Sequence, residues 1–139
     1  MAIAVKVKDL MDKDIVSIDA NTSVADTVAT MINSKVWSLL VVTRGLPQGV
    51  VTERDVLRRC INNGLAPDKV KVGAIMSSPL ITIGPDATVR EAMSMMVEKD
   101  VRRLYVVEGG KVVGRITQTR LFQSNFDLMM SLSGLTGAL

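Results

Sequence analysis

Apolar residues in the first half of the chain follow two alternating periods. Residues 15–18 alternate weakly with polar residues and predict a strand. Val24, Val28, Met31 and Ile32 then recur at helical spacing, which predicts a helix with one apolar face. Residues 38–42 form a near-continuous apolar run, which is typical of a strand buried on both faces.

The next stretch predicts a hairpin strand followed by a second helix. A Gly-Pro turn at residues 44–48 leads into the short apolar strand 49–51. Thr52 stands where a helix would begin, and Asn63-Gly64 would end that helix. The apolar spacing along it predicts four inward-facing side chains, Val56, Leu57, Cys60 and Ile61.

The whole pattern returns after a shift of 65 residues. Residues 80–83 repeat the first strand, residues 103–107 the buried strand and residues 114–117 the hairpin strand. Val89, Ala92, Met93, Met96 and Val97 repeat the first helix face, behind a complete capping box, Thr88 to Glu91. Identical pairs include Met11/Met76, Ile18/Ile83, Val24/Val89, Leu39/Leu104, Gly45/Gly110, Gly49/Gly114 and Thr52/Thr117. The chain is therefore a tandem duplication with unit order strand-helix-strand-strand-helix.

The end of the chain departs from the repeat. Leu121, Phe122, Phe126, Met129 and Met130 continue at roughly helical spacing until Ser133-Gly134. This spacing predicts a final helix whose apolar stripe packs on the core or on a second subunit. A membrane-lying helix fits less well, because its polar face carries no basic cluster.

Composition removes several function classes. The chain contains no histidine, so the commonest general base, the commonest zinc ligand and every serine–histidine triad are absent, and a metal site built on Cys60 alone is not expected. No GxxxxGK[ST] or GxGxxG motif occurs either, and we expect a protein that is not an enzyme. The net charge of +3 and the aromatic content of 3% disfavour nucleic-acid binding. The chain has no apolar run long enough for a membrane and no signal-peptide core near Met1, so we expect a cytoplasmic protein.

The stretch Gly49-Val50-Val51-Thr52-Glu53-Arg54-Asp55 carries the main candidate chemistry. Thr52 and Asp55 lie three residues apart around a helix start, so both can face one site. A carboxylate can accept hydrogen bonds from both hydroxyls of a ribose cis-diol. The amides at the helix start and the Arg54 side chain would suit a phosphate. Thr-x-x-Asp is also an ordinary helix cap, and the spacing alone leaves both interpretations open.

The duplicated unit resembles a pair of CBS (cystathionine β-synthase-type) domains, also called a Bateman module. The resemblance spans about residues 7–122 and rests on Val7–Met11, Val72–Met76, Thr88–Met93, Val101–Val107 and Gly49–Asp55. It implies an α/β (α+β) fold with pseudo-two-fold symmetry. The expected divisions are a first CBS domain at 1–65, a second at 66–122 and a C-terminal helical tail at 123–139.

The resemblance further implies a regulatory module that binds AMP, ADP or ATP in the cleft between its domains. The nucleotide would be a ligand and not a catalytic cofactor, and we expect a homodimer acting on an effector protein whose identity the sequence does not give. The implied roles are ribose contacts, an apolar adenine floor and phosphate contacts. The implied binding residues are Val50, Thr52, Arg54, Asp55, Met76, Pro79, Ile81, Val101, Arg102 and Arg103.

Two positions depart from the family pattern. Arg120 stands where the second motif would carry its aspartate, and a guanidinium has no acceptor for hydroxyl protons. We therefore predict one good nucleotide site per chain, at Asp55. Trp37-Ser38 replaces the basic pair Arg102-Arg103, and Trp37 could stack on a ligand or cover the core edge. A ligand-free assembly scaffold and an S-adenosylmethionine sensor stay open as alternatives.

Overall fold

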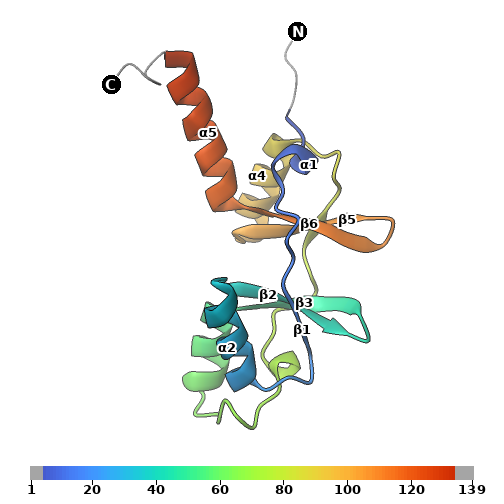
Figure 1. Cartoon of the computed structure of the whole chain (residues 1–139), viewed down its shortest axis with the longest axis vertical. Helices are drawn as coiled ribbons and strands as arrows, with labels where there is room; N and C mark the ends of the chain where they lie inside the picture. The colour runs from blue at the N-terminus through green and yellow to red at the C-terminus, as the bar shows by residue number, and fades with distance from the viewer. Residues whose placement is uncertain (1–4, 134–139) are drawn as a thin grey trace. The chain divides into compact units, whose positions relative to one another are not determined.

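The computed structural model describes residues 5–133, which divide into two compact units. One unit comprises residues 15–81, and the other combines residues 5–14 with residues 82–133. Each unit contains a three-stranded sheet covered by helices, so the mixed α/β fold predicted from the repeat is confirmed (Figure 1).

The unit of residues 15–81 follows the predicted order of elements. Its strands are β1 (Ser17–Asp19), β2 (Ser38–Thr43) and β3 (Leu46–Thr52), with β1 parallel and β3 antiparallel to the central β2. Its helices are α2 (Val24–Ser34), α3 (Glu53–Asp55), the π-helix η1 (Val56–Ile61) and the 3-10 turn η2 (Val72–Ala74). A single core joins them: Val24, Met31, Leu39, Val41, Val51, Val56, Cys60, Val72 and Ile75.

The other unit repeats this topology. The short helix α1 (Val7–Leu10) comes first in the chain, followed after the first unit by β4 (Thr82–Ile83), α4 (Val89–Lys99), β5 (Arg103–Glu108), β6 (Lys111–Thr117) and α5 (Gln118–Ser133). β5 is central, with β4 parallel and β6 antiparallel to it. The capping box predicted at Thr88 is present, since Thr88 Oγ1 accepts from the Glu91 amide at 3.1 Å. Gly134, the expected helix stop, lies outside the described residues.

Both units are completed by a leading segment, which we define as the residues just before each first strand, 5–14 and 66–81. Lys6 pairs with Thr88 and Asp12 with Arg115, so the first leading segment belongs to the second repeat. Lys71 pairs with Ser23 and Ser77 with Val50, so the second leading segment belongs to the first repeat. The compact units thus exchange leading segments relative to the sequence repeats. The domain boundaries at 65 and 122 stay a prediction about the repeat.

Gly49 in β3 and Gly114 in β6 lie where a leading segment crosses close to the strand. A Cβ on Gly49 would overlap the Ser77 carbonyl oxygen, and a Cβ on Gly114 would overlap the Met11 sulfur. Neither glycine has a positive φ, so the requirement is for space and not for backbone conformation.

The sequence predicted more inward-facing residues on the helices than the structure buries. Leu57 and Ile61, expected to point inward, are 60% and 51% exposed, whereas Val56 and Cys60 are buried. Ile32, Met93 and Val97 are likewise exposed, although they continue the apolar stripes of α2 and α4. A helix on a sheet buries only the part of its surface that faces the sheet, and periodicity does not distinguish that part from a neighbouring apolar strip.

The final helix α5 is a second case. Leu121 is buried, but Phe122, Phe126 and Met129 are 74%, 54% and 68% exposed. Figure 1 shows the far part of α5 extending past the sheet and α4 of its own unit. The predicted packing of this helix on the core is therefore found only in its first turns.

Candidate functional site

Asp55 is held at the junction of β3 and α3 by a reciprocal cap. The Asp55 amide donates to Thr52 Oγ1 at 3.2 Å, and the Thr52 amide donates to Asp55 Oδ2 at 3.0 Å. The Thr52 hydroxyl lies 3.2 Å from the same carboxylate oxygen. The residue is only 6% exposed. The helix-cap interpretation of Thr-x-x-Asp is therefore correct, and any ligand role must be compatible with it.

The second leading segment brings a further hydroxyl to this carboxylate. Ser77 Oγ donates to Asp55 Oδ1 at 2.9 Å. The backbones of Val50 and Ser77 exchange two hydrogen bonds, of 3.0 and 2.8 Å, which fix the segment beside β3. Val50, Thr52, Asp55 and Met76, four of the predicted binding residues, are thus brought into one neighbourhood by the contacts of the unit itself.

Arg59 was not among the predicted residues, yet it ties η1 to the same segment. Its Nη1 donates to the carbonyl oxygens of Ile75, at 3.2 Å, and Met76, at 2.8 Å. Its Nε lies 3.9 Å from Asp55 Oδ1, which makes a weak ion pair because the arginine side chain is half exposed. The sequence signal was available, since Asp55 and Arg59 are four residues apart on one helix.

The Asp55 carboxylate retains limited acceptor capacity. An ionised carboxylate offers about four lone-pair positions, and the two Thr52 donors and Ser77 occupy three of them. The two hydroxyls of a cis-diol need two positions. A ribose could therefore bind only if one protein hydroxyl, Ser77 or Thr52, turned away.

The amides at the helix start are less free than the sequence suggested. The Glu53 amide donates to the Trp37 carbonyl at 3.2 Å, and the Asp55 amide is taken by Thr52. This corrects the expectation of open amides for a phosphate. The exposed side chain of Arg54 remains a candidate phosphate partner at this end of the helix.

The other predicted residues are placed as follows. Ile81 is half-buried and Pro79 is exposed. Val101, Arg102 and Arg103 belong to the other compact unit, so their role in this site stays a prediction. Trp37 is 62% exposed, so most of its surface does not lie against the core of this chain, and both interpretations of it stay predictions.

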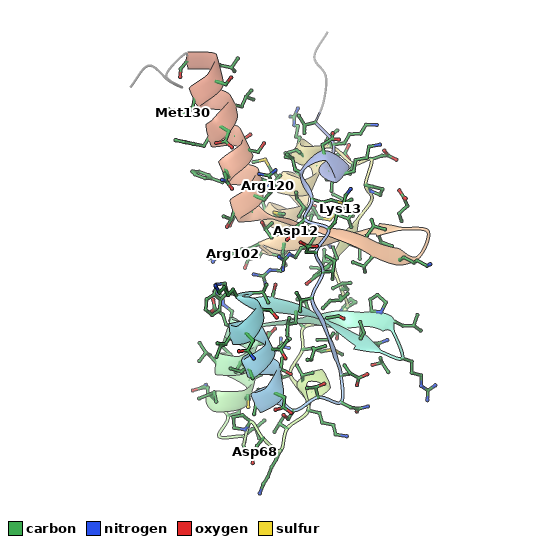
Figure 2. All side chains as sticks on the ribbon, viewed as in Figure 1. Asp12, Lys13, Asp68, Arg102, Arg120 and Met130 are labelled. Carbon is green, nitrogen blue, oxygen red and sulfur yellow. The ribbon has the colours of Figure 1, made fainter. Side chains whose placement is uncertain are left out.

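The equivalent place in the other unit carries different charges. Arg120, the counterpart of Asp55, donates from Nε to the Leu10 carbonyl at 3.3 Å, and its amide is capped by Thr117 Oγ1 at 3.1 Å. Asp12, the counterpart of Ser77, pairs with Arg115 at 3.4 Å. Figure 2 labels Arg120 at the start of α5 and Asp12 in the first leading segment. A carboxylate is present here too, but on the leading segment and next to an arginine.

Other kinds of site find little support in the part of the chain that the structure describes. Between residues 5 and 133, no three acidic or cysteine side chains gather as a metal site would require. Over the same residues, none of the helices is both long and apolar enough to traverse a lipid bilayer.

Comparison with known proteins places this geometry in a family. The CBS domain profile matches residues 7–62 and again residues 72–125. An uncharacterised protein of Methanopyrus kandleri is 31% identical over 122 residues, which are 86% of this chain and 62% of that relative.

Two solved structures are similar in fold. The crystal structure of an uncharacterised conserved protein from Pyrococcus horikoshii has 30% identity and a TM-score of 0.83, covering 90% of this chain and 95% of that one. A hexameric CBS-CP12 protein from bloom-forming cyanobacteria has 25% identity and a TM-score of 0.80, covering 87% and 68%. With two consecutive profile matches and the same tandem topology in each unit, the chain belongs to the CBS domain family.

Proposed function

We propose that this chain is a regulatory module that binds an adenine nucleotide, AMP, ADP or ATP, at Asp55 and signals its presence to a partner protein. CBS domain pairs are generally regulatory modules that bind adenosine ligands. In this proposal the module catalyses no reaction. It also associates with itself, and the similar CBS-CP12 protein is hexameric.

The observation that supports the proposal most is the Asp55 carboxylate. The carboxylate is nearly buried. Among the described residues, it accepts hydrogen bonds from the Thr52 amide and from the hydroxyls of Thr52 and Ser77. A hydroxyl bound to a carboxylate can be replaced by a ribose hydroxyl at little net cost, because one charge-assisted bond replaces another. The capped aspartate is therefore a preorganised acceptor for a diol.

The neighbouring residues provide the remaining contacts of the proposal. Met76 and Val50 offer apolar surface next to the carboxylate, and Arg54 offers a guanidinium that suits a phosphate. The predicted contributions of Pro79, Ile81, Val101, Arg102 and Arg103 complete the proposed set. In the other unit, Arg120 cannot accept from a ribose hydroxyl, so the proposal assigns the diol contact to Asp55 alone.

The test uses calorimetric titration of the whole chain with AMP, ADP, ATP and S-adenosylmethionine. The variant is Asp55→Asn, which keeps the size of the side chain and one acceptor for the cap. Losing a charge-assisted hydrogen bond of about 1.5–3 kcal/mol should weaken binding roughly tenfold or more. Arg120→Gln, at the equivalent position of the other unit, should bind the preferred nucleotide as the wild type does.

A comparison of ribose with deoxyribose makes the test specific. The wild type should bind the preferred nucleotide more tightly than its 2′-deoxy form, and Asp55→Asn should reduce that difference. An unchanged preference in Asp55→Asn would show that this carboxylate does not contact the ribose. If none of the four ligands binds the wild type, the ligand-free assembly scaffold becomes the better description.

Regulation requires that the ligand favours one of two states of the module. Arg59 links η1, which follows Asp55 directly, to the leading segment through the Ile75 and Met76 carbonyls. A ribose that displaces Ser77 would alter the contacts of this same segment. We include this segment in the proposal as the element through which binding is reported to a partner.

A further inference from the structure

The first leading segment brings three charged side chains together at the end of β6. Arg115 of β6 lies 3.4 Å from the Asp12 carboxylate, and Arg120 of α5 donates from Nε to the Leu10 carbonyl at 3.3 Å. All of these residues belong to one compact unit, and Figure 2 labels Asp12 and Arg120 on the two segments. We call Asp12, Arg115 and Arg120 the charged crossing.

The two guanidinium groups of the crossing are held near each other by their anchors. Leu10 and Asp12 are two residues apart, and Met11 between them has an extended backbone, with φ −66° and ψ 148°. Two extended residues span at most about 7 Å. The backbones of Asp12 and Arg115 also exchange two hydrogen bonds of 2.8 Å each. Arg115 and Arg120 therefore lie close enough to contact one small anion together.

Arg120 has donors to offer to a ligand. A guanidinium has five N–H donors, and the bond to Leu10 uses one of them. The residue is exposed and stands in the first turn of α5, a helix of sixteen residues whose N-terminus adds partial positive charge. The pair of Asp12 and Arg115 is long, and the Asp12 side chain is 49% exposed, so this ion pair is weak.

The same three positions of the first repeat carry the opposite net charge. They are Val50, Asp55 and Ser77, with a single negative charge, whereas the charged crossing has two positive charges and one negative charge. The second repeat thus has a guanidinium where the first has an acceptor for hydroxyls, and another where the first has apolar surface. A ribose and a base lose their partners at the crossing, and an oxyanion gains them.

We propose that the charged crossing binds a compact phosphate compound, such as inorganic phosphate or pyrophosphate, that carries no nucleoside. A phosphate group has roughly two negative charges at neutral pH, which matches the two guanidinium groups. Planar guanidinium groups also bind phosphate oxygens through paired hydrogen bonds. The site is separate from Asp55 and does not depend on the proposed function.

Asp12 acts against the anion in this site. Its Oδ2 lies beside Arg115, and its Oδ1 accepts from the Asp14 amide at 2.9 Å. A phosphate that contacts Arg115 competes with Oδ2 and is repelled by the carboxylate charge. Removal of that charge therefore strengthens anion binding, whereas removal of a guanidinium weakens it.

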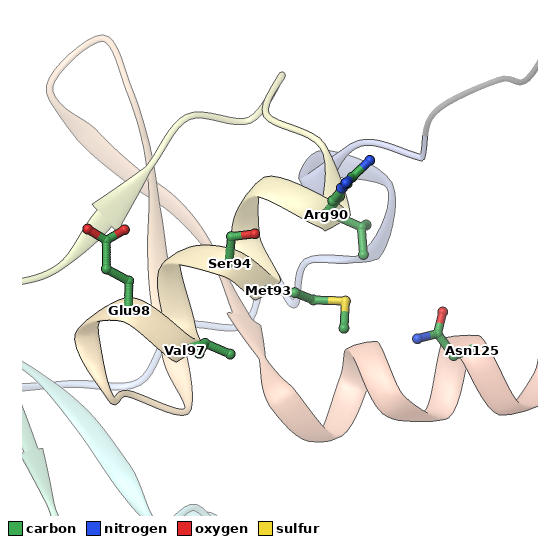
Figure 3. Close-up of a pocket in the computed structure, with 7 residues that line it drawn as sticks. Arg90, Met93, Ser94, Val97, Glu98 and Asn125 are labelled. Carbon is green, nitrogen blue, oxygen red and sulfur yellow. The ribbon is translucent and has the colours of Figure 1, made fainter.

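The groove beside α4 and α5 has a different charge pattern. Its lining includes Arg90 and Glu98, with Met93 and Val97 between them along α4. Figure 3 shows Arg90 and Glu98 toward opposite ends of this helix. An anion in the groove would meet a carboxylate as well as a guanidinium, across apolar surface. Arg90 is exposed and carries the same charge as Arg120, so it provides a matched control in the same unit.

The test is calorimetric titration of the whole chain with pyrophosphate, in a buffer without phosphate. Arg120→Gln should weaken pyrophosphate binding about tenfold or more, because a charge-assisted hydrogen bond is lost. Arg90→Gln removes the same charge elsewhere in the unit and should leave the affinity unchanged. Thermal unfolding of each variant without ligand shows that it is folded.

Asp12→Asn should change the affinity in the opposite direction. Asparagine keeps an oxygen for the Asp14 amide but removes the competing charge, so pyrophosphate should bind several-fold more tightly. A crossing that only fastens the leading segment would not gain affinity in this way. A wild type that does not bind pyrophosphate, an Arg120→Gln variant that binds it unchanged, or an Asp12→Asn variant without tighter binding would each overturn the proposal.

The Asp55 variant separates this site from the proposed function. Asp55→Asn should bind pyrophosphate as the wild type does, and Arg120→Gln should keep the affinity for the nucleotide. If Arg120→Gln weakened the nucleotide and pyrophosphate equally, the anion at the crossing would be the phosphates of the nucleotide, and a separate site would be refuted. A wild type that binds a nucleotide but not pyrophosphate would leave the proposed function standing while this site fails.

Discussion

Gly49→Ala is expected to destabilise the chain more than Gly114→Ala, although both change the same position of the repeat. A methyl group on Gly49 would overlap the Ser77 carbonyl oxygen, which is backbone and cannot rotate away. A methyl group on Gly114 would instead overlap Cγ and Sδ of the Met11 side chain, which is flexible and can turn aside, while its nearest backbone atom, the Asp12 carbonyl oxygen, would lie 3.2 Å away. The two substitutions therefore compare a rigid obstacle with a soft one.

The size of the difference follows from the hydrogen bonds at stake. Moving Ser77 away would break its two backbone bonds to Val50 and its hydroxyl bond to Asp55. At about 1 kcal/mol net for each bond, the loss is about 3 kcal/mol. The lower entropy of alanine in the unfolded chain returns about 0.5–1 kcal/mol. We expect a net loss of about 2 kcal/mol for Gly49→Ala and of about 0.5–1 kcal/mol for Gly114→Ala, where only side-chain repacking is needed.

Urea unfolding of the two variants and the wild type measures this difference directly. In thermal unfolding, Gly49→Ala should lower Tm by roughly 6 °C, given the usual few degrees per kcal/mol for a chain of this size. Equal losses for the two variants, or a greater loss for Gly114→Ala, would refute the assignment of the Gly49–Ser77 crossing as the tighter one.

Two further predictions concern side chains at the site and on the surface. Ser77→Ala should lower the free energy of unfolding in urea by about 1–2 kcal/mol, because Asp55 loses a buried hydrogen-bond donor. It should not weaken nucleotide binding in calorimetry, since the ribose gains a vacant acceptor position on Asp55. A loss of affinity as large as in Asp55→Asn would contradict this. Lys8, by hydrogen bond and charge, lowers the pKa of Asp86 from its ordinary 3.8, so the folded state binds this proton less readily than the unfolded chain. The pair thus stabilises the fold at neutral pH, and its contribution fades as the pH falls below 3.8 through the lowered pKa. Asp86→Asn should be slightly less stable than the wild type at pH 7 and equal to it at pH 2; a difference in stability that persists at pH 2 would point to another cause.

The sequence predicted the elements well because their signals are local. The buried runs at β2 and β5 and the cap at Thr88 depend on neighbouring residues, and the structure confirms them. The inward direction of Leu57 and Ile61 was wrong, since a helical period does not say whether an apolar side faces the core or a missing partner. Ser77 lies 22 residues from Asp55, and only the folded leading segment brings the two together. The cap between Thr52 and Asp55 could be predicted from their spacing. The hydrogen bond from Ser77, which would compete with a ribose hydroxyl for the Asp55 carboxylate, could not.

The exchange of leading segments sets an order for folding during synthesis. Residues 15–81 are continuous in the chain, so their unit contains all its strands and its leading segment once residue 81 has left the ribosome. Residues 5–14 are made before that unit, yet Val7 and Asp12 find their backbone partners only at Ala87 and Arg115. This segment therefore waits longer for its partners than the unit that follows it in the chain, and the second unit closes around a segment made before the first unit began.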